Sequence, residues 1–204
     1  MTGEILTRVY PNTEIDRREV LRYAGAAPDS KASAELLDSL IEDCRDLFTP
    51  RVCYTEFDVK KTESELDLGF TVTDSKALGK CLSGCDRIIL FAGTVGGKID
   101  RLMTKYAVTS AAKALLLQAL GAERIEALAD EFSKDIKEDA LKRGYTVTPR
   151  FSPGYADLSL SLQRDIFRVL DCQRKIGLTL NESLLMSPTK SITAIIGLKR
   201  NENY

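Results

Sequence analysis

The sequence predicts an α+β fold in which helices flank a mostly antiparallel sheet. Strand-like runs come early in the chain, helices dominate its middle, and strand-like runs return at its end, without regular alternation of strand and helix. That order favours an α+β arrangement over a doubly wound parallel sheet. With 204 residues, 44% of them hydrophobic, the chain is long and apolar enough for one domain, 1–204, with its own core.

Charge and hydropathy narrow the classes of partner. The formal net charge is −1, from 29 Lys and Arg against 30 Asp and Glu, so no basic excess indicates nucleic acid or an anionic membrane. The longest apolar runs are far shorter than a membrane span, and the charged first residues are unlike a secretory signal. We therefore expect a cytoplasmic protein. The absence of histidine removes the usual general base and the commonest metal ligand.

Three elements are predicted before residue 50. Residues 4–10 alternate as a strand does, and residues 12–25 read as a short helix with Asn12 or Thr13 as its N-cap. Residues 29–48 carry apolar side chains at helical spacing, which predicts a longer helix with one buried stripe.

The next forty residues change period. Residues 51–59 and 66–72 are expected to pair as a hairpin, or at least to form two adjacent strands. Residues 75–85 are expected to form a short helix, and residues 87–96 a buried strand. The glycines that follow, "GTVGGK", match neither common phosphate-binding motif. A turn from strand to helix that needs a permissive backbone explains them better than a nucleotide site.

Helices fill the middle of the chain, and strands close it. Residues 109–122 are nearly apolar throughout and predict a buried helix, which Gly121 separates from an amphipathic helix over 123–144. A further amphipathic helix is expected over 160–171. Residues 176–198 read as two strands joined by a turn at a Ser-Pro pair.

Five cysteines occur, an odd number that favours reduced thiols in the absence of a secretion signal. Only Cys81 and Cys85 lie close in sequence, and no second pair or histidine completes a zinc site around them. On a helix they would share one face, so a packing role is favoured over metal or redox chemistry. The alternative is a pair of cluster ligands completed by a partner.

The segment "TVTPRFSPGYADLSLSLQRDIF", residues 146–167, raises a functional question. Arg150 stands at the end of a β-rich run, a sharp turn follows at Pro153, Gly154 and Tyr155, and a helix then begins. A surface connection would explain the turn alone. A ligand-binding loop explains it better, because the downstream sequence adds a second motif in a fixed order.

That ordered pair of motifs resembles the activation domain of cobalamin-dependent methionine synthase. The family has an R-x-x-P-G-Y segment, then a helix, then a G-x-x-L-T-E-S-like segment that ends in M-x-P. The matching positions here are Arg150, Pro153, Gly154, Tyr155, Gly177, Leu180, Glu182, Ser183, Met186 and Pro188. The resemblance is strongest over 123–197, and the whole chain is similar to a free-standing version of the domain.

The resemblance implies a curved α+β fold and a role in reactivation. The family's domain binds S-adenosylmethionine and sits over the corrinoid when cobalamin has fallen to the inactive cob(II)alamin state. An electron from flavodoxin or a similar donor, together with methyl transfer from S-adenosylmethionine, restores methylcobalamin. The implied partner is a cobalamin-dependent methionine synthase that lacks its own activation domain and carries the cobalamin, with a flavodoxin-like protein or another electron donor.

The resemblance also implies which residues bind S-adenosylmethionine. Arg150 would grip the ligand's carboxylate bidentately, and Gly154 would let backbone groups approach the adenine. Asp130 aligns with a family carboxylate on the preceding helix, and it and Glu131 fall on the flanks of that helix's apolar stripe. The full expected set is Arg150, Ser152, Pro153, Gly154, Tyr155, Asp130, Glu131 and Tyr204. No residue of this chain is expected to act as a catalytic nucleophile or base, and no metal ligand is expected.

Two other classes of function compete with reactivation. The chain could be a docking or scaffold module for a corrinoid protein that kept the fold and lost S-adenosylmethionine binding. A stand-alone S-adenosylmethionine methyltransferase is disfavoured by the missing Rossmann-type glycine motif and by the lack of a candidate base.

Overall fold

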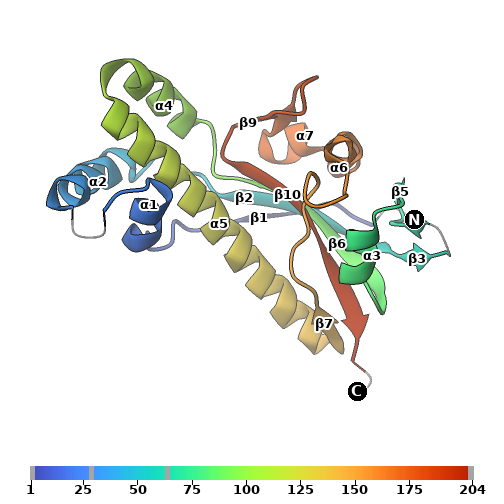
Figure 1. Ribbon diagram of the computed structural model, residues 1–204. Coiled ribbons are helices and arrows are strands. Elements are labelled where there is room, and N and C mark those ends of the chain that lie inside the picture. Colours follow the sequence, from blue (N-terminus) through green and yellow to red (C-terminus); the bar gives the residue numbers. More distant parts are fainter. Residues whose placement is uncertain (1–2, 28–29, 63–64, 202–204) are drawn as a thin grey trace.

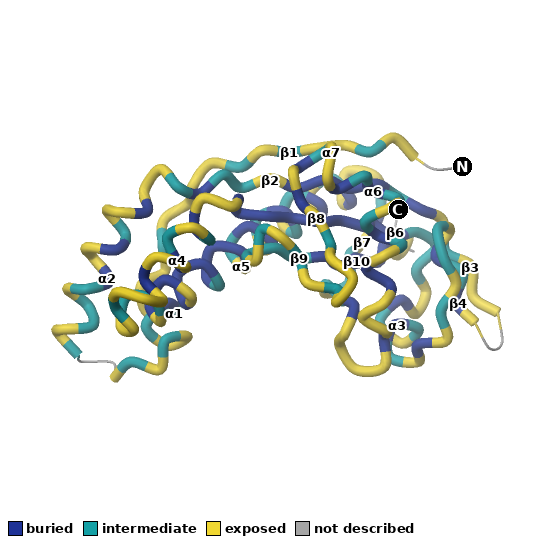
Figure 2. Tube along the Cα trace, turned by 90° about the horizontal axis from the view of Figure 1, so that it is seen from above, coloured by how far each residue is buried: buried dark blue, intermediate teal, exposed yellow. Residues whose placement is uncertain are grey.

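Five antiparallel strands form the central sheet of the computed structural model, which describes residues 3–27, 30–62 and 65–201. The strand order is β1 (Leu6–Val9), β2 (Arg51–Asp58), β6 (Cys85–Thr94), β10 (Ser191–Arg200) and β7 (Tyr145–Val147). Every neighbouring pair is antiparallel, which confirms the predicted α+β class and sheet type. The molecule is bent into an arch, with α2 (Lys31–Cys44) and α4 (Lys98–Thr109) at one end and α3 (Lys76–Cys81) and β3 (Lys60–Lys61) at the other (Figure 2).

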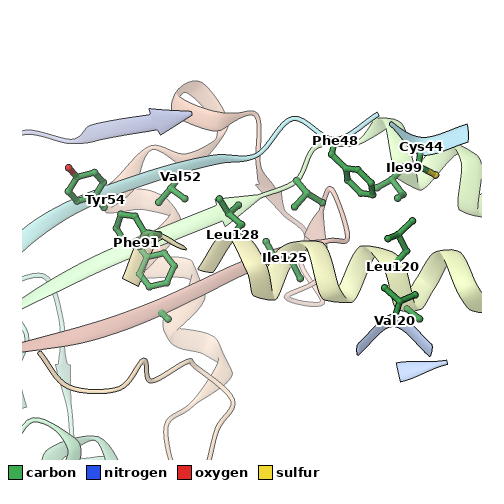
Figure 3. Close-up of a cluster of buried hydrophobic side chains, with 14 of the residues drawn as sticks. Val20, Cys44, Phe48, Val52, Tyr54, Phe91, Ile99, Leu120, Ile125 and Leu128 are labelled. Carbon is green, nitrogen blue, oxygen red and sulfur yellow. The ribbon is translucent and has the colours of Figure 1, made fainter. Parts of the chain in front are cut away.

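The long helix α5 (Ala111–Lys142) covers one face of the sheet, joined by α1 (Arg17–Tyr23), α2 (Lys31–Cys44) and α4 (Lys98–Thr109) (Figure 1). Its side chains meet alternate residues of the strands, as the two-residue period of a strand requires. Figure 3 shows Val52, Tyr54 and Phe91 on the strands together with Leu128 of α5. The ring of Phe132 on α5 lies 4.6 Å from that of Phe91 and 5.1 Å from that of Tyr54.

The other face of the sheet carries a second core. It is covered by α3 (Lys76–Cys81), α6 (Gln163–Leu170) and α7 (Cys172–Ile176), together with the small sheet of β3 (Lys60–Lys61), β4 (Leu66–Asp67) and β5 (Val72–Thr73). On β6, Ile88 and Leu90 point to this side, whereas Ile89 and Phe91 point to α5. Burial on both faces explains the unbroken apolar run of β6.

The predicted helix break at Gly121 is wrong. Helix α5 runs unbroken through Gly121, which is buried. A Cβ at this position would lie only 2.9 Å from side-chain carbons of Lys190, so the glycine makes room for the lysine stem rather than ending a helix. A single helical glycine costs about 1 kcal/mol relative to alanine, which packing on both sides of it can offset.

The predicted hairpin of 51–59 with 66–72 is also wrong in its main part. Strand β2 pairs with β1 and β6, whereas β4 pairs with β3 and β5. Alternation of apolar residues shows that a segment is a strand, but it does not show which strand lies beside it. Pairing of β2 with the distant strand β6 is favoured over the local hairpin because it joins the two strands at eight positions.

Helix boundaries shift by a few residues. Helix α1 begins after Asp16, whose side chain accepts from the backbone N–H groups of Arg18 and Glu19, so the expected N-cap at Asn12 or Thr13 is wrong. The helix expected over 160–171 becomes a 3-10 turn (Leu160–Leu162) and α6, which Asp171 ends in a left-handed conformation before α7.

The C-terminal strands form two separate units. The short strands β8 (Thr179–Leu180) and β9 (Met186–Ser187) pair with each other, and β10 joins the central sheet. Within the described part of the chain, no helix combines the length and apolarity that crossing a membrane would need.

Candidate functional site

The segment after β7 is fastened to the middle of β10 before it turns. Thr148 donates its N–H to the carbonyl of Gly197 (3.0 Å), and its Oγ1 accepts from the N–H of Gly197 (2.9 Å). Phe151 and Ile195 form an isolated antiparallel bridge further along. Arg150 lies between these two anchor points, so its backbone is held by the central sheet rather than by a free loop.

The Pro153–Gly154–Tyr155 turn is compact. Gly154 has φ +85°, a region that favours glycine, and its N–H donates to the carbonyl of Leu158 (2.8 Å). Pro153 is buried and Ser152 is half-buried, whereas the Tyr155 side chain is among the large exposed ones at 69%. The Tyr155 ring stands edge-on to Phe151 at 5.6 Å. The turn therefore presents an aromatic ring and open backbone at the surface.

Arg150 points to α5 and forms two ion pairs there. One terminal nitrogen of its guanidinium lies 2.7 Å from Asp130 Oδ1, and the other lies 3.0 Å from Glu126 Oε2. The Arg150 side chain is 22% exposed, but those of Glu126 and Asp130 are 49% and 75% exposed. A half-buried cation thus meets two accessible carboxylates, and a ligand that brings both a carboxylate and a cation can exchange partners with them.

Glu126 is the site residue that the sequence prediction missed. It lies one turn before Asp130 on the same face of α5, and residues four apart on a helix are neighbours. That spacing was the available signal. Burial first, and then negative charges that include Glu19 and Glu126, raise the pKa of the Tyr23 phenol on α1.

Glu131 does not join this cluster in the way that Asp130 does. It lies on another flank of α5, where it lines a cavity of about 10 Å³ with Tyr10, Asn12 and Arg124, room for about one water molecule. Adjacent helical residues point about 100° apart, so Asp130 and Glu131 could not both face Arg150. Tyr204, the last expected contact, lies outside the described residues.

Asp157 supports the turn from the far side by capping α3. Its carboxylate accepts from the backbone N–H of Lys76 (2.9 Å) and Ala77 (3.3 Å) and pairs with the Ser75 hydroxyl. These hydrogen bonds, that of Ser75 foremost, hold the pKa of the Asp157 carboxyl below its usual value. The turn is thereby tied to a second element of the fold.

The remaining motif residues lie elsewhere. Met186 is partly buried and packs against the second core, and the Glu182 carbonyl accepts from Arg164 (3.0 Å). Cys81 ends α3 and Cys85 begins β6, so the prediction that both share a helix face is wrong. Among the residues that the structure describes, no group of three or more side chains of metal-binding type could hold an ion.

Comparison with protein families places residues 78–204 within the family "Vitamin B12 dependent methionine synthase, activation domain". The matched span includes the Arg150 segment, the turn and the C-terminal strands, and exceeds half of the chain. The chain belongs to this family. The resemblance seen in the sequence is therefore confirmed.

The fold of this activation domain is shared with a solved structure. The crystal structure of the MetH reactivation domain bound to AdoHcy superposes with a TM-score of 0.74 at 15% sequence identity, over 99% of this chain and 80% of that one. At this identity the likeness establishes the fold, and it extends to residues before the family match. A search of curated protein sequences finds no match.

Proposed function

We propose that this activation domain binds S-adenosylmethionine and docks on a separate cobalamin-dependent methionine synthase to support reductive methylation of its cob(II)alamin. The observation that carries the proposal is the pairing of Arg150 with Asp130 and Glu126 beside the Pro153–Gly154–Tyr155 turn. The amino-acid end of S-adenosylmethionine bears one carboxylate and one ammonium, the counterparts of Arg150 and of the two acids.

The remaining features of the site suit the rest of the ligand. Gly154 is exposed and carries no side chain, so a flat adenine ring can approach the backbone there, and Tyr155 offers a π-face at the rim. That the related MetH domain was crystallised with AdoHcy supports a ligand of this chemical class.

In this proposal, the reacting metal and the electron come from the partner proteins rather than from this chain. The partner's cobalamin would supply the nucleophilic metal, and a flavodoxin-like protein or another donor would supply the electron. This chain's contribution is to hold the sulfonium ligand in place and to exclude water, which needs no general base. The absence of histidine from the sequence is compatible with that role and requires that any lower ligand to the cobalt come from elsewhere.

Calorimetric titration with S-adenosylmethionine tests the proposal. Wild type should show saturable binding, Arg150→Ala should lose it, and Arg164→Ala should keep it. Arg164 is a suitable control because it follows the same turn and, among the residues that the structure describes, hydrogen-bonds a backbone carbonyl rather than an acid. If wild type binds no ligand, alone or with the partner synthase present, the proposal fails. Ligand-independent co-purification with a corrinoid protein would then favour the docking module.

A further inference from the structure

The charges at Arg150 do not balance. One guanidinium faces two carboxylates, Asp130 at 2.7 Å and Glu126 at 3.0 Å, so this cluster carries one negative charge in excess. Both acids are accessible enough to meet a ligand, since about half of the Glu126 side chain and most of the Asp130 side chain are exposed. A zwitterionic amino acid needs only one of these acids for its ammonium.

Neighbouring groups on α1 leave that excess in place. On α1, the Arg22 guanidinium is held by Glu19 through its Nε (3.1 Å) and a terminal nitrogen. The Arg22 guanidinium also stacks over the Tyr23 ring at 4.7 Å. The charge of Arg22 is therefore balanced by Glu19, and it does not cancel that of Glu126.

Only the sulfonium form of the ligand matches this charge pattern. S-adenosylmethionine bears an ammonium, a sulfonium and a carboxylate, whereas S-adenosylhomocysteine, left after methyl transfer, lacks the sulfonium charge. The carboxylates of Glu126 and Asp130 belong to residues one helical turn apart, about 5–6 Å between Cβ atoms. That separation is of the order of the short alkyl chain between the ligand's ammonium and its sulfur.

We propose that Glu126 is the specificity residue that favours the methylated sulfonium ligand over its neutral thioether product. The inference rests on the proposed function and deepens it. When the ligand's carboxylate takes over the Arg150 guanidinium, both acids are released. Asp130 then meets the ammonium, and Glu126 is left to stabilise the sulfonium. Loss of the methyl group removes that last attraction, which favours release of the spent ligand.

The test is the ratio of two affinities rather than either one alone. Replacing Glu126 also frees Arg150 for any ligand carboxylate, and this effect is common to both ligands and cancels in the ratio. We expect Glu126→Gln to reduce the preference for S-adenosylmethionine over S-adenosylhomocysteine by about threefold to tenfold, the range of a partly exposed charge pair. In wild type the preference should also shrink as salt is raised.

Calorimetry with both ligands on wild type, Glu126→Gln and Glu131→Gln decides the matter. Glu131→Gln removes the same charge from another flank of α5 and should leave the ratio unchanged. An unchanged ratio in Glu126→Gln, with binding intact, overturns this inference and leaves the proposed function standing. A drop in the ratio in Asp130→Asn alone would assign the sulfonium to Asp130 and overturn it too. If wild type binds neither ligand, both proposals fall.

Discussion

Phe151 and Ile195 exchange both of their backbone hydrogen bonds, each N–H donating to the other's carbonyl at 2.9 Å. Ile195 is fully buried near the middle of β10, so this bridge ties the segment that carries Arg150 to the buried part of the central sheet. Ligand-binding side chains on a rigid support lose little conformational freedom on binding. The turn that follows depends on the same support.

Gly154→Ala should destabilise the turn and weaken ligand binding. The new Cβ would combine a φ of +85° with a contact of 3.1 Å to Leu160, for a loss of about 1–2 kcal/mol in the free energy of unfolding. Gly25→Ala is the matched control, because Gly25 also has positive φ (+63°) but no neighbour within 4 Å of the added methyl. Urea denaturation gives the free energy of unfolding of both variants. Equal losses in the two variants would show that the Leu160 contact contributes nothing.

Asp130→Asn should lower the affinity for S-adenosylmethionine and leave stability nearly unchanged. An ion pair as exposed as that of Asp130 contributes only about 0–1 kcal/mol to folding, whereas a ligand ammonium would lose its charged acceptor. Calorimetry should give an affinity reduced by about threefold to thirtyfold. An Asp130→Asn protein that binds as tightly as wild type would remove Asp130 from the site.

Phe132→Ala should be among the most destabilising single changes on α5. The ring is fully buried between Tyr54 and Phe91, and deletion of such a side chain costs about 3–5 kcal/mol. Leu141→Ala, at an exposed position of the same helix, should change the free energy of unfolding by less than about 1 kcal/mol. Chemical denaturation of the two variants tests the contrast, and similar losses would contradict the assigned core.

Arg124→Ala should cost about 3–5 kcal/mol, because it leaves the Glu123 carboxylate buried without its partner. Arg124 also donates to the carbonyls of Thr13 (2.7 Å) and Glu14 (2.9 Å), which fastens the chain ahead of α1 to α5. The double variant Glu123→Gln/Arg124→Met should recover part of the loss. A double variant no more stable than Arg124→Ala would show that the contacts to the Thr13–Glu14 carbonyls dominate.

The stabilising effect of Asp157 should disappear in acid. Hydrogen bonds to its carboxylate hold the pKa of Asp157 below the ordinary 3.8, so its contribution is present above pH 3.8 and is lost as the pH falls through the lower folded-state value. The difference in thermal midpoint between wild type and Asp157→Asn should therefore shrink below pH 3.8. Asp74→Asn is the control, because it removes a nearby charge without removing a carboxylate that caps α3. A difference for Asp157→Asn that stays constant down to pH 2 would contradict the linkage.

Local patterns predicted element types well where one face or both faces of an element are buried. The apolar run of β6 and the stripes of α2 and α5 follow directly from their residues. The same patterns wrongly predicted a helix break at Gly121, because close packing against Lys190 can override the preference of a single glycine for a helix end. They also failed to pair β2 with β6, because strand pairing depends on residues far away in the chain.

By itself, the sequence determined the α+β class and the family, since these depend on the order of its segments and on ordered local motifs. Only the tertiary structure decided which acids meet Arg150. In the structure, Asp130 and Glu126 meet Arg150, whereas Glu131 lines a small cavity on another flank of α5. The reason is that the orientation of α5 on the sheet fixes which helical flank faces the segment after β7. Arg150 lies 20 positions from Asp130 and 24 from Glu126, so no local pattern shows that these side chains meet.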